Sequence, residues 1–338
     1  MKPAAILALT PQGADLGRRL QTGLKADLWV PRILARRGEC AFSSFKAALT
    51  EIWKAEAQIV AIAATGIVVR CIAPLLQAKD QDPAVVVLDH QGSYAVSLLS
   101  GHLGGANDLA RRVAALTGGQ AVITTATDCQ GLTAIDEVAR MKGMAPEPLQ
   151  AVRRVNMALL TGRKVQVLDP EKRLNWDLEC PSGYVLSTDP DPNLPLVQVS
   201  WSTEVHPQAW LWLRPKSLVA GMGCNSGTSA SEILDLVYST CTRHHLAPSS
   251  LACLVSTSKK AREPGLINAA AELDIDFVCI PHHALQGVSV LTPSDMVHKH
   301  MGVPSICEAT AIVHSRKGQI LVPKTKSINA TLAIALQS

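Results

Sequence analysis

Residues 100–108, with the sequence SGHLGGAND, hold the densest group of side chains that could do chemistry. Glycines let a backbone approach a ligand closely, and the helix expected after them offers free N–H groups to a carboxylate or a developing oxyanion. His102 adds the side chain that moves protons most readily near neutral pH. A second interpretation stays open, in which Asn107 or Asp108 caps the helix and His102 is an ordinary loop histidine. The candidate site residues here are Gly101, His102, Gly104, Gly105, Asn107 and Asp108.

Two other strand ends carry polar residues that could close on the same cleft. Residues 124–128 (TTATD) follow a short apolar run, and open α/β sheets bind ligands at the carboxyl ends of their strands. The hydroxyl of Thr125 suits a carboxylate, although the same threonines could equally cap a helix. Thr65 and Gly66 end another apolar run, with Arg70 one turn further along. An arginine in so apolar a segment needs either an internal carboxylate or an anionic ligand, and both remain open.

The C-terminal part has a glycine-rich stretch of its own, residues 221–229 (GMGCNSGTS), between an apolar run and a helical pattern. The dinucleotide-binding fingerprint is Gly-x-Gly-x-x-Gly, and here the third glycine comes one position late. An anion-binding helix start remains open, with Gly223 and Thr228 as its candidate residues. Lys259 lies in a basic stretch whose alternative is a solvated charged turn. Glu308 is a carboxylate in an apolar helix, either functional or part of a buried structural pair.

Composition narrows the class of protein. Of 338 residues, 47% are hydrophobic and 18% charged, which excludes a disordered or coiled-coil chain. A net charge of +4 from 32 basic and 28 acidic residues is too balanced for a dedicated nucleic-acid binder. Nine scattered cysteines without a Cys-x-x-Cys, and no histidine pair at metal-ligand spacing, predict neither a disulfide framework nor a metal site. The N-terminus does not resemble a signal peptide and the most apolar window contains Arg70, so we expect a cytoplasmic protein without a membrane span.

Short apolar runs alternate with amphipathic helical patterns along most of the chain. Strands are predicted in the N-terminal part at residues 5–9, 58–63, 84–88, 94–99 and 121–124. This alternation predicts an α/β fold, with a mostly parallel, helix-covered sheet in an N-terminal domain of residues 1–133. Prolines and tryptophans gather in residues 134–215, which we expect to form an irregular or β-rich middle domain or linker. The alternation returns in residues 216–338, a C-terminal α/β domain.

Segments along nearly the whole chain match, in order, the pattern of one known family. In the N-terminal part they are residues 65–70 (TGIVVR), 72–76 (IAPLL), Lys79, 82–87 (DPAVVV), 97–107 (SLLSGHLGGAN) and 124–128 (TTATD). In the C-terminal part they are residues 221–224 (GMGC), 227–229 (GTS), Lys259, 263–266 (EPGL) and 307–309 (CEA). The set resembles the cobalt-precorrin-5A hydrolases of the oxygen-independent cobalamin pathway. One departure is Asn225 and Ser226, where the family often carries basic residues, and it weakens a carboxylate-binding role for that loop.

The resemblance implies a reaction and a set of roles. Such hydrolases open the δ-lactone of cobalt-precorrin-5A with water and release acetaldehyde, giving cobalt-precorrin-5B in anaerobic cobalamin (vitamin B12) biosynthesis. Cobalt belongs to the substrate, so no cofactor of the protein is implied. His102 would be the general base or proton shuttle, oriented by Asp108 or Asp128. Backbone N–H groups around Gly104 and Gly105 would hold the oxyanion. The side chains that would receive carboxylate arms of the tetrapyrrole are Arg70, Lys79 and Lys259.

Partners and alternative functions follow from the same reading. The expected partner is the cobalt-precorrin tetrapyrrole, with neither nucleic acid nor membrane. A homodimer, and transfer of intermediates to or from other corrin-pathway enzymes, are left open. One alternative function is a non-catalytic carrier of corrinoid intermediates, although an Asp-x-His-x-x-Gly cobalt-ligand signature is absent. The other is a nucleotide-dependent oxidoreductase that uses residues 221–227.

Overall fold

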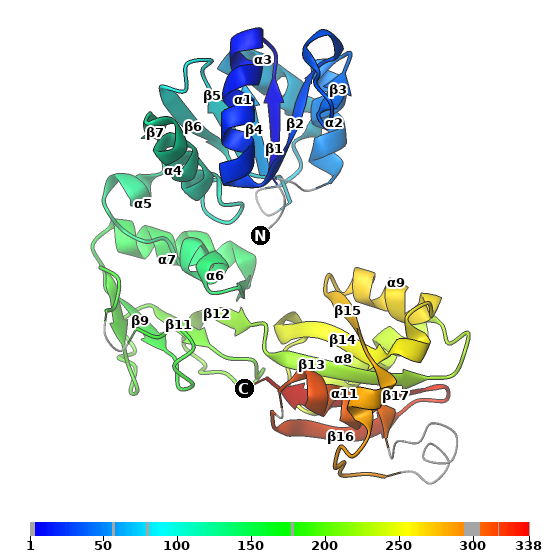
Figure 1. Cartoon of the computed structure of the whole chain (residues 1–338). Coiled ribbons are helices and arrows are strands. Elements are labelled where there is room, and N and C mark those ends of the chain that lie inside the picture. The colour runs from blue at the N-terminus through cyan, green and yellow to red at the C-terminus, as the bar shows by residue number, and fades with distance from the viewer. Residues whose placement is uncertain are drawn as a thin grey trace. The chain divides into compact units, whose positions relative to one another are not determined.

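Parallel strands covered by helices dominate the computed structural model, which describes residues 4–55, 58–78, 81–176, 179–293, 305–316 and 318–337 (Figure 1). The predicted α/β fold class is confirmed. The chain divides into two compact units. Unit 1 comprises Met1–Met141, Asn156–Arg163 and Pro181–Gly183, and unit 2 comprises Lys142–Val155, Lys164–Cys180 and Tyr184–Ser338. Lys79 lies outside the described residues. Among the helices within those ranges, none has the length and apolar character needed to cross a membrane.

A seven-stranded sheet, ordered β3-β2-β1-β4-β5-β6-β7, forms the core of unit 1. Its strands are β1 (Ala4–Ala8), β2 (Ala26–Pro31), β3 (Cys40–Phe42), β4 (Gln58–Ile62), β5 (Val85–Leu88), β6 (Tyr94–Leu99) and β7 (Gln120–Val122). The helices of this part are α1 (Pro11–Leu24), α2 (Phe45–Lys54), α3 (Thr65–Ile72), α4 (Ala106–Thr117), α5 (Ala126–Cys129) and α6 (Ile135–Met141), with short 3-10 turns η1 (Arg32–Leu34) and η2 (Ala73–Leu75).

Each face of this sheet has its own apolar core, because side chains alternate between the two faces of a strand. Helices α1 and α4 cover one face, where Leu16 and Leu109 pack against Ile6. Helices α2 and α3 cover the other face, where Leu49 and Val68 are buried. Burial on both faces explains why the sequence of β4 and β5 is continuously apolar rather than alternating.

Two strands of this sheet, β6 and β7, run in the direction opposite to the other five. β6 runs antiparallel to β5, so that Val85 pairs with Leu99 and Leu88 pairs with Ala95. β4 and β5 are parallel to each other, and so are β6 and β7. The carboxyl ends of β6 and β7 therefore lie at the edge where β5 begins, whereas the carboxyl ends of β1 and β4 lie at the opposite edge. Loops that follow β4 and β6 are separated by the length of the strands.

Unit 2 contains two five-stranded sheets, ordered β10-β9-β11-β12-β8 and β15-β14-β13-β17-β16. The strands of the first are β8 (Met144–Glu147), β9 (Val165–Leu168), β10 (Tyr184–Leu186), β11 (Leu196–Val199) and β12 (Ala209–Pro215). Those of the second are β13 (Leu218–Cys224), β14 (Leu251–Thr257), β15 (Asp276–Ile280), β16 (Ile320–Lys326) and β17 (Ala330–Leu336). The remaining helical segments are α7 (Leu149–Leu160), α8 (Ala230–Arg243), α9 (Pro264–Glu272), α11 (Ile306–His314), η3 (Pro248–Ser250), η4 (Ser258–Lys260) and η5 (His282–Leu285).

Helix α11 lies unusually close to strand β13 in the second of these sheets. A Cβ added to Gly221 would lie 2.0 Å from the carbonyl oxygen of Cys307 and 2.8 Å from the backbone nitrogen of Ala311. Real Cβ atoms do not approach backbone atoms at such distances, so only glycine fits at this position. The first glycine of residues 221–229 is therefore required for packing between a helix and a strand.

Candidate active site

The loop between β6 and α4 owes its tight shape to glycine. Ser100 has a left-handed backbone with φ of 55°, and Gly105 follows with φ of 88°. A Cβ on Gly104 would lie 2.4 Å from the Cβ of Ser100, and one on Gly101 would lie 2.8 Å from the side-chain oxygen of Asn107. These glycines allow the loop that carries His102 to fold onto itself.

Backbone hydrogen bonds within the loop use the N–H groups at the start of α4. The N–H of Gly105 donates to the carbonyl of His102 at 3.1 Å, and the N–H of Ala106 donates to the carbonyl of Ser100 at 3.1 Å. Asn107 donates from its backbone to Gly101 at 3.0 Å. The N–H of Gly105 is thus engaged and not free for an oxyanion, contrary to expectation.

His102 lies between two carboxylates from separate elements. Its Nε2 is 2.9 Å from Oδ2 of Asp128 in α5 and 3.1 Å from the hydroxyl of Thr127. Its Nδ1 is 3.6 Å from Oδ2 of Asp136 in α6. The side chain of His102 is 11% exposed, that of Asp128 8% and that of Asp136 10%. Nε2 is within hydrogen-bond distance of two partners, whereas the separation at Nδ1 is longer than an ordinary hydrogen bond.

The two carboxylates decide the charge of His102. Burial by itself would lower the pKa of His102, but its interactions with Asp136 and Asp128 outweigh burial and raise that pKa. Burial would raise the pKa of Asp128, yet hydrogen bonds from Thr125 and His102 hold it below its usual range. The pKa of Asp136 is likewise lowered, because contacts with His102 and Asn156 overcome its burial. The group therefore favours an imidazolium between two carboxylates.

Asn107 and Thr125 fix the position of Asp128 from behind. Asn107 is 2% exposed, and its amide nitrogen donates to Oγ1 of Thr125 and to Oδ2 of Asp128, both at 3.0 Å. Its amide oxygen accepts a hydrogen bond from Ser97 at 2.7 Å. The hydroxyl of Thr125 donates to Asp128 at 2.5 Å. Both residues were predicted as substrate ligands. In the structure they donate hydrogen bonds to Asp128, whose carboxylate contacts His102.

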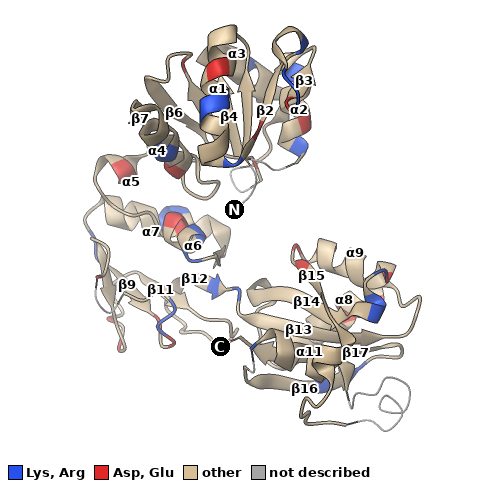
Figure 2. Cartoon of the chain, viewed as in Figure 1, with Lys and Arg blue, Asp and Glu red and all other residues tan. Residues whose placement is uncertain are grey.

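Two arginines surround the same site with positive charge. Arg111 in α4 contacts Asp128, lies 3.0 Å from Asp108 and lies 3.8 Å from Glu137. Arg140 in α6 contacts Asp108 and donates from Nε to the carbonyl of His102 at 2.8 Å. Figure 2 shows these acidic and basic positions together on α4, α5 and α6. Asp108 therefore pairs with the arginines, and Asp128 is the one of the two predicted carboxylates that contacts His102.

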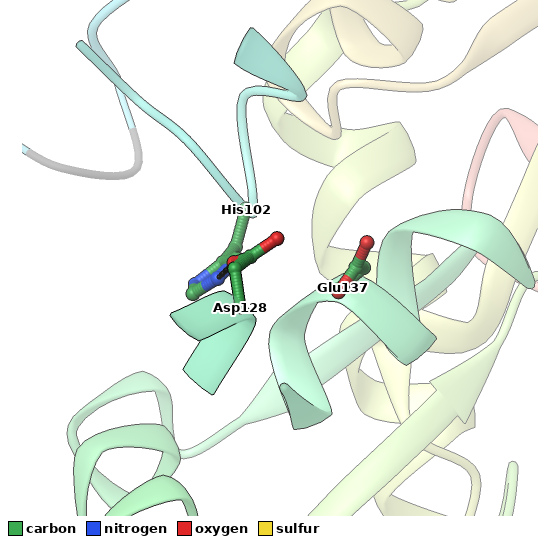
Figure 3. Close-up of side chains that lie close together, drawn as sticks. All are labelled: His102, Asp128 and Glu137. Carbon is green, nitrogen blue, oxygen red and sulfur yellow. Dashed lines mark hydrogen bonds and ion pairs between the residues drawn. The ribbon is translucent and has the colours of Figure 1, made fainter. Parts of the chain in front are cut away.

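His102, Asp128 and Glu137 each offer one nitrogen or oxygen atom within 4.8 Å of the others, a spacing that a metal ion could use (Figure 3). The guanidinium of Arg111, however, already contacts Asp128 and lies beside Glu137. A cation placed among these atoms would compete with that guanidinium for the same charge. The donor set is therefore that of an ion-pair network in which an arginine supplies the counter-charge.

The loop after β4 lies at the other edge of the sheet. Thr65 borders a pocket of about 400 Å³ formed where β1, β4 and β5 end, together with Thr10, Asp89 and Tyr94. Arg70 is exposed, and in the described part of the chain its guanidinium contacts its own helix at the carbonyl of Gly66, 3.3 Å away. The expectation that this loop closes on the His102 cleft is wrong, because β6 runs antiparallel to β5.

Donors in the glycine-rich loop of unit 2, residues 221–229, already bind other residues of the same unit. The N–H of Gly227 donates to Glu263 at 2.8 Å, and Lys260 lies 2.9 Å from the other oxygen of that carboxylate. Thr228 is buried and donates to the carbonyl of Asn225 at 2.9 Å. These internal contacts use donors that were expected to meet an anion.

The other candidates of unit 2 lie apart from this loop or serve packing. A Cβ on Gly223 would lie 2.8 Å from the hydroxyl of Thr331, so that glycine fits a close strand contact. Lys259 is exposed in η4. Glu308 is fully buried and accepts hydrogen bonds from the backbone N–H groups of Thr292 at 2.9 Å and Lys324 at 3.1 Å. Of its two predicted roles, the contacts of Glu308 favour the structural one.

Comparison with known proteins matches three successive segments of the chain. Residues 47–128 match the family model described as Cobalamin synthesis G N-terminal, residues 133–215 match the Cobalamin biosynthesis central region, and residues 218–335 match the Cobalamin synthesis G C-terminus. A cobalt-precorrin-5A hydrolase of Priestia megaterium is 30% identical over 98% of this chain and 94% of its own. One of Salmonella typhimurium is 32% identical over 98% of this chain and 97% of its own. The chain belongs to the cobalt-precorrin-5A hydrolase family.

A shorter relative covers one part of this family's chain. Protein CobE of a Sinorhizobium species is 28% identical over 121 residues, which are 35% of this chain and 79% of the relative. The two hydrolases, by contrast, align along nearly their full length. The family assignment therefore rests on the complete three-part arrangement and not on a single domain.

Four residues of this hydrolase-family site were missed from the sequence: Arg111, Asp136, Glu137 and Arg140. Three of them lie beyond residue 133, and unit 1 continues to Met141. The sequence signal for these three is the segment AIDEVAR at residues 134–140, in which two acidic residues lie between buried apolar residues of a helix. Buried acids need partners, and Asp136 meets the amide of Asn156 at 2.9 Å and Nδ1 of His102 at 3.6 Å.

Asp136→Asn is expected to lower the pKa of His102. The variant removes one of the two negative charges that raise that pKa, while the amide keeps a hydrogen-bonding group beside Asn156. The midpoint is measured by following the His102 ring protons by NMR as pH changes. Asp15→Asn, on the exposed side of α1, is the control and leaves the His102 midpoint in place. An unchanged midpoint in Asp136→Asn would contradict the assigned ion pair.

Proposed function

We propose that this chain hydrolyses the δ-lactone of cobalt-precorrin-5A and releases acetaldehyde, giving cobalt-precorrin-5B in anaerobic cobalamin biosynthesis. The observation that carries the proposal is identity of 30% and 32% with two cobalt-precorrin-5A hydrolases along nearly the whole chain. The buried histidine with two flanking carboxylates adds a group suited to proton transfer at neutral pH. We place the reaction in the cytoplasm.

The reaction needs proton transfers in both directions. Water attacks the lactone carbonyl while a base removes one of its protons, and the ring oxygen takes up a proton as its bond to the carbonyl carbon breaks. The new hydroxyl then loses its proton as the neighbouring carbon–carbon bond breaks. Acetaldehyde leaves, and the electron pair of that bond stays on the macrocycle. His102 in its imidazolium form is proposed as the proton donor, with Asp128 and Asp136 as positioning residues.

Substrate contacts complete the proposal. Arg70 and the start of α3 in unit 1 are proposed to bind a carboxylate arm of the tetrapyrrole that lies away from the lactone, because this loop is at the opposite end of the strands from His102. Arg70 is exposed, so its guanidinium can meet a carboxylate from solvent. Lys79 and Lys259 are proposed as further ligands of such arms. Cobalt enters and leaves with the substrate, and the proposal gives the protein no cofactor of its own.

The test is acetaldehyde release from cobalt-precorrin-5A by the unmutated chain. We expect one acetaldehyde for each cobalt-precorrin-5B formed. Tight corrinoid binding without acetaldehyde would favour the carrier instead, and a calorimetric titration showing NAD(P) or flavin binding would favour the oxidoreductase.

Asp128→Asn is expected to lower the turnover number about 100-fold, since it removes the negative charge that pairs with Nε2 of His102. Asp108→Asn is the comparison, because Asp108 contacts arginines and not the histidine. Steady-state rates of acetaldehyde formation and thermal midpoints are measured for both. A larger loss in Asp108→Asn than in Asp128→Asn would show that the roles of the two aspartates are reversed.

A further inference from the structure

The proposed proton donor leaves the reaction without a base, and Glu137 is a carboxylate near His102 to which the proposed function gives no role. Its carboxylate lies within 4.8 Å of a ring nitrogen of His102 and an oxygen of Asp128. Figure 3 shows that the three side chains come from separate segments of the chain. A water bonded to two groups about 2.8 Å away can bridge a gap of this size. The spacing thus fits one water or one reacting oxygen.

The bonding of Glu137 differs from that of its neighbours. Asp128 accepts hydrogen bonds from Thr125 and Asn107, and Asp136 accepts one from Asn156. Within the described ranges, the carboxylate of Glu137 accepts no hydrogen bond and meets Arg111 at 3.8 Å. Its side chain is 12% exposed. Glu137 is therefore the carboxylate of this group with lone pairs available to a water.

Charges on three surrounding elements act on Glu137. Burial raises its pKa, and the carboxylates of Asp128 in α5 and Asp108 in α4 raise it further, against lowering by His102 and Arg111. A carboxylate with a raised pKa is a stronger base once ionised. Against the effect of its burial, Asp136 and Asp128 raise the pKa of His102, which favours its acid form.

We propose that Glu137 is the general base that removes a proton from the water attacking the lactone, while Arg111 positions its carboxylate and His102 supplies the returning proton. The inference rests on the proposed function, which it deepens. One proton passes from water to Glu137, and the new oxygen–carbon bond takes the electron pair of the broken O–H bond. His102 gives one proton to the released ring oxygen. A proton exchange with solvent then restores both groups.

Glu137→Gln tests the assignment, because it keeps the size of the side chain and removes its basicity. We expect kcat for acetaldehyde release to fall about 100-fold or more. In the unmutated enzyme kcat falls as pH drops through the pKa of Glu137, and the variant loses this acid limb. Glu137→Asp keeps a carboxylate and is expected to recover part of the rate together with the limb. Glu51→Gln, an exposed position on α2, is the matched control with full activity.

Several outcomes would overturn the inference. An acid limb that persists in a folded Glu137→Gln variant would exclude Glu137 as the base. Loss of unmutated activity after treatment with a chelator, restored by a divalent metal, would make Glu137 a metal ligand instead. A readout without substrate separates this inference from the proposed function: the carboxyl carbon of labelled Glu137 is followed by NMR against pH. A midpoint equal to that of Glu51 contradicts the inference even if the chain releases acetaldehyde, and a raised midpoint supports it even if the chain does not.

Discussion

His102→Gln is expected to lower the rate of acetaldehyde release about 100-fold to 10,000-fold, the range for removal of a proton-transfer group. Glutamine can still accept and donate hydrogen bonds beside Asp128 and Thr127, but it cannot hold and return a proton. The rate is measured under saturating cobalt-precorrin-5A, so that loss of binding is not mistaken for loss of chemistry. His283→Gln, an exposed histidine in η5, is the matched control and keeps the full rate. A rate within threefold of the unmutated enzyme would remove His102 from the mechanism.

The same substitution has a separate effect on stability that depends on pH. The folded state raises the pKa of His102 above its ordinary value of 6.5, so its protonation contributes stability below that pH. This contribution is lost as pH rises through the raised folded pKa. The thermal midpoint of the unmutated chain should thus decrease through that window, and the decrease should be smaller in His102→Gln. Equal pH dependence of the two midpoints would show that the ion pairs add nothing to folding.

Gly221→Ala is expected to disrupt the second sheet of unit 2. Its new Cβ would meet the Cys307 carbonyl oxygen at 2.0 Å, and because backbone cannot swing aside, α11 must move off β13. We expect the free energy of unfolding to fall by about 3 kcal/mol, the upper end of the range for overpacking. Urea unfolding followed by circular dichroism measures the change.

Gly227→Ala provides the control within the same motif. Gly227 has φ of 80°, and no atom of the described residues lies within 4 Å of an added Cβ, so alanine there meets backbone strain without a clash. We expect a loss of about 1 kcal/mol. If both variants were equally stable, the close approach of α11 to β13 would not be the reason for Gly221. These different requirements explain the glycines of residues 221–229 without a nucleotide.

Part of the active site could be predicted because it follows local rules. The loop after β6 and residues 124–128 both follow strands that run in parallel, and such strand ends meet at one edge. The opposite placement of Thr65 depends on the reversal between β5 and β6. Five residues separate these strands, which is too few for a crossover between parallel strands. The length of this loop therefore indicates an antiparallel pair.

Other members of the site could not be found from local patterns. Asp136 and Glu137 belong to a short helix after the last recognised motif, and their partners His102 and Arg111 are more than twenty residues earlier in the chain. Charge pairs at such separations depend on how helices pack, which hydrophobic periodicity does not encode. The hydrogen bond from the N–H of Gly105 to His102 could not be predicted either. Whether an N–H group at the start of a helix is free depends on the conformation of the turn before it.

Asn156 has a consequence for any attempt to divide this enzyme. It lies fifteen residues after Met141, yet its side chain accepts from the N–H of Ile135 at 2.9 Å and donates to Asp136 at 2.9 Å. A fragment that ends at residue 133 or 141 would contain His102 but would lack the Asn156 side chain that binds Asp136. Chimeras that exchange the central region between relatives would lose the same two hydrogen bonds unless residue 156 stays asparagine. The His102 site in the N-terminal part of the chain thus depends on a residue of the central region.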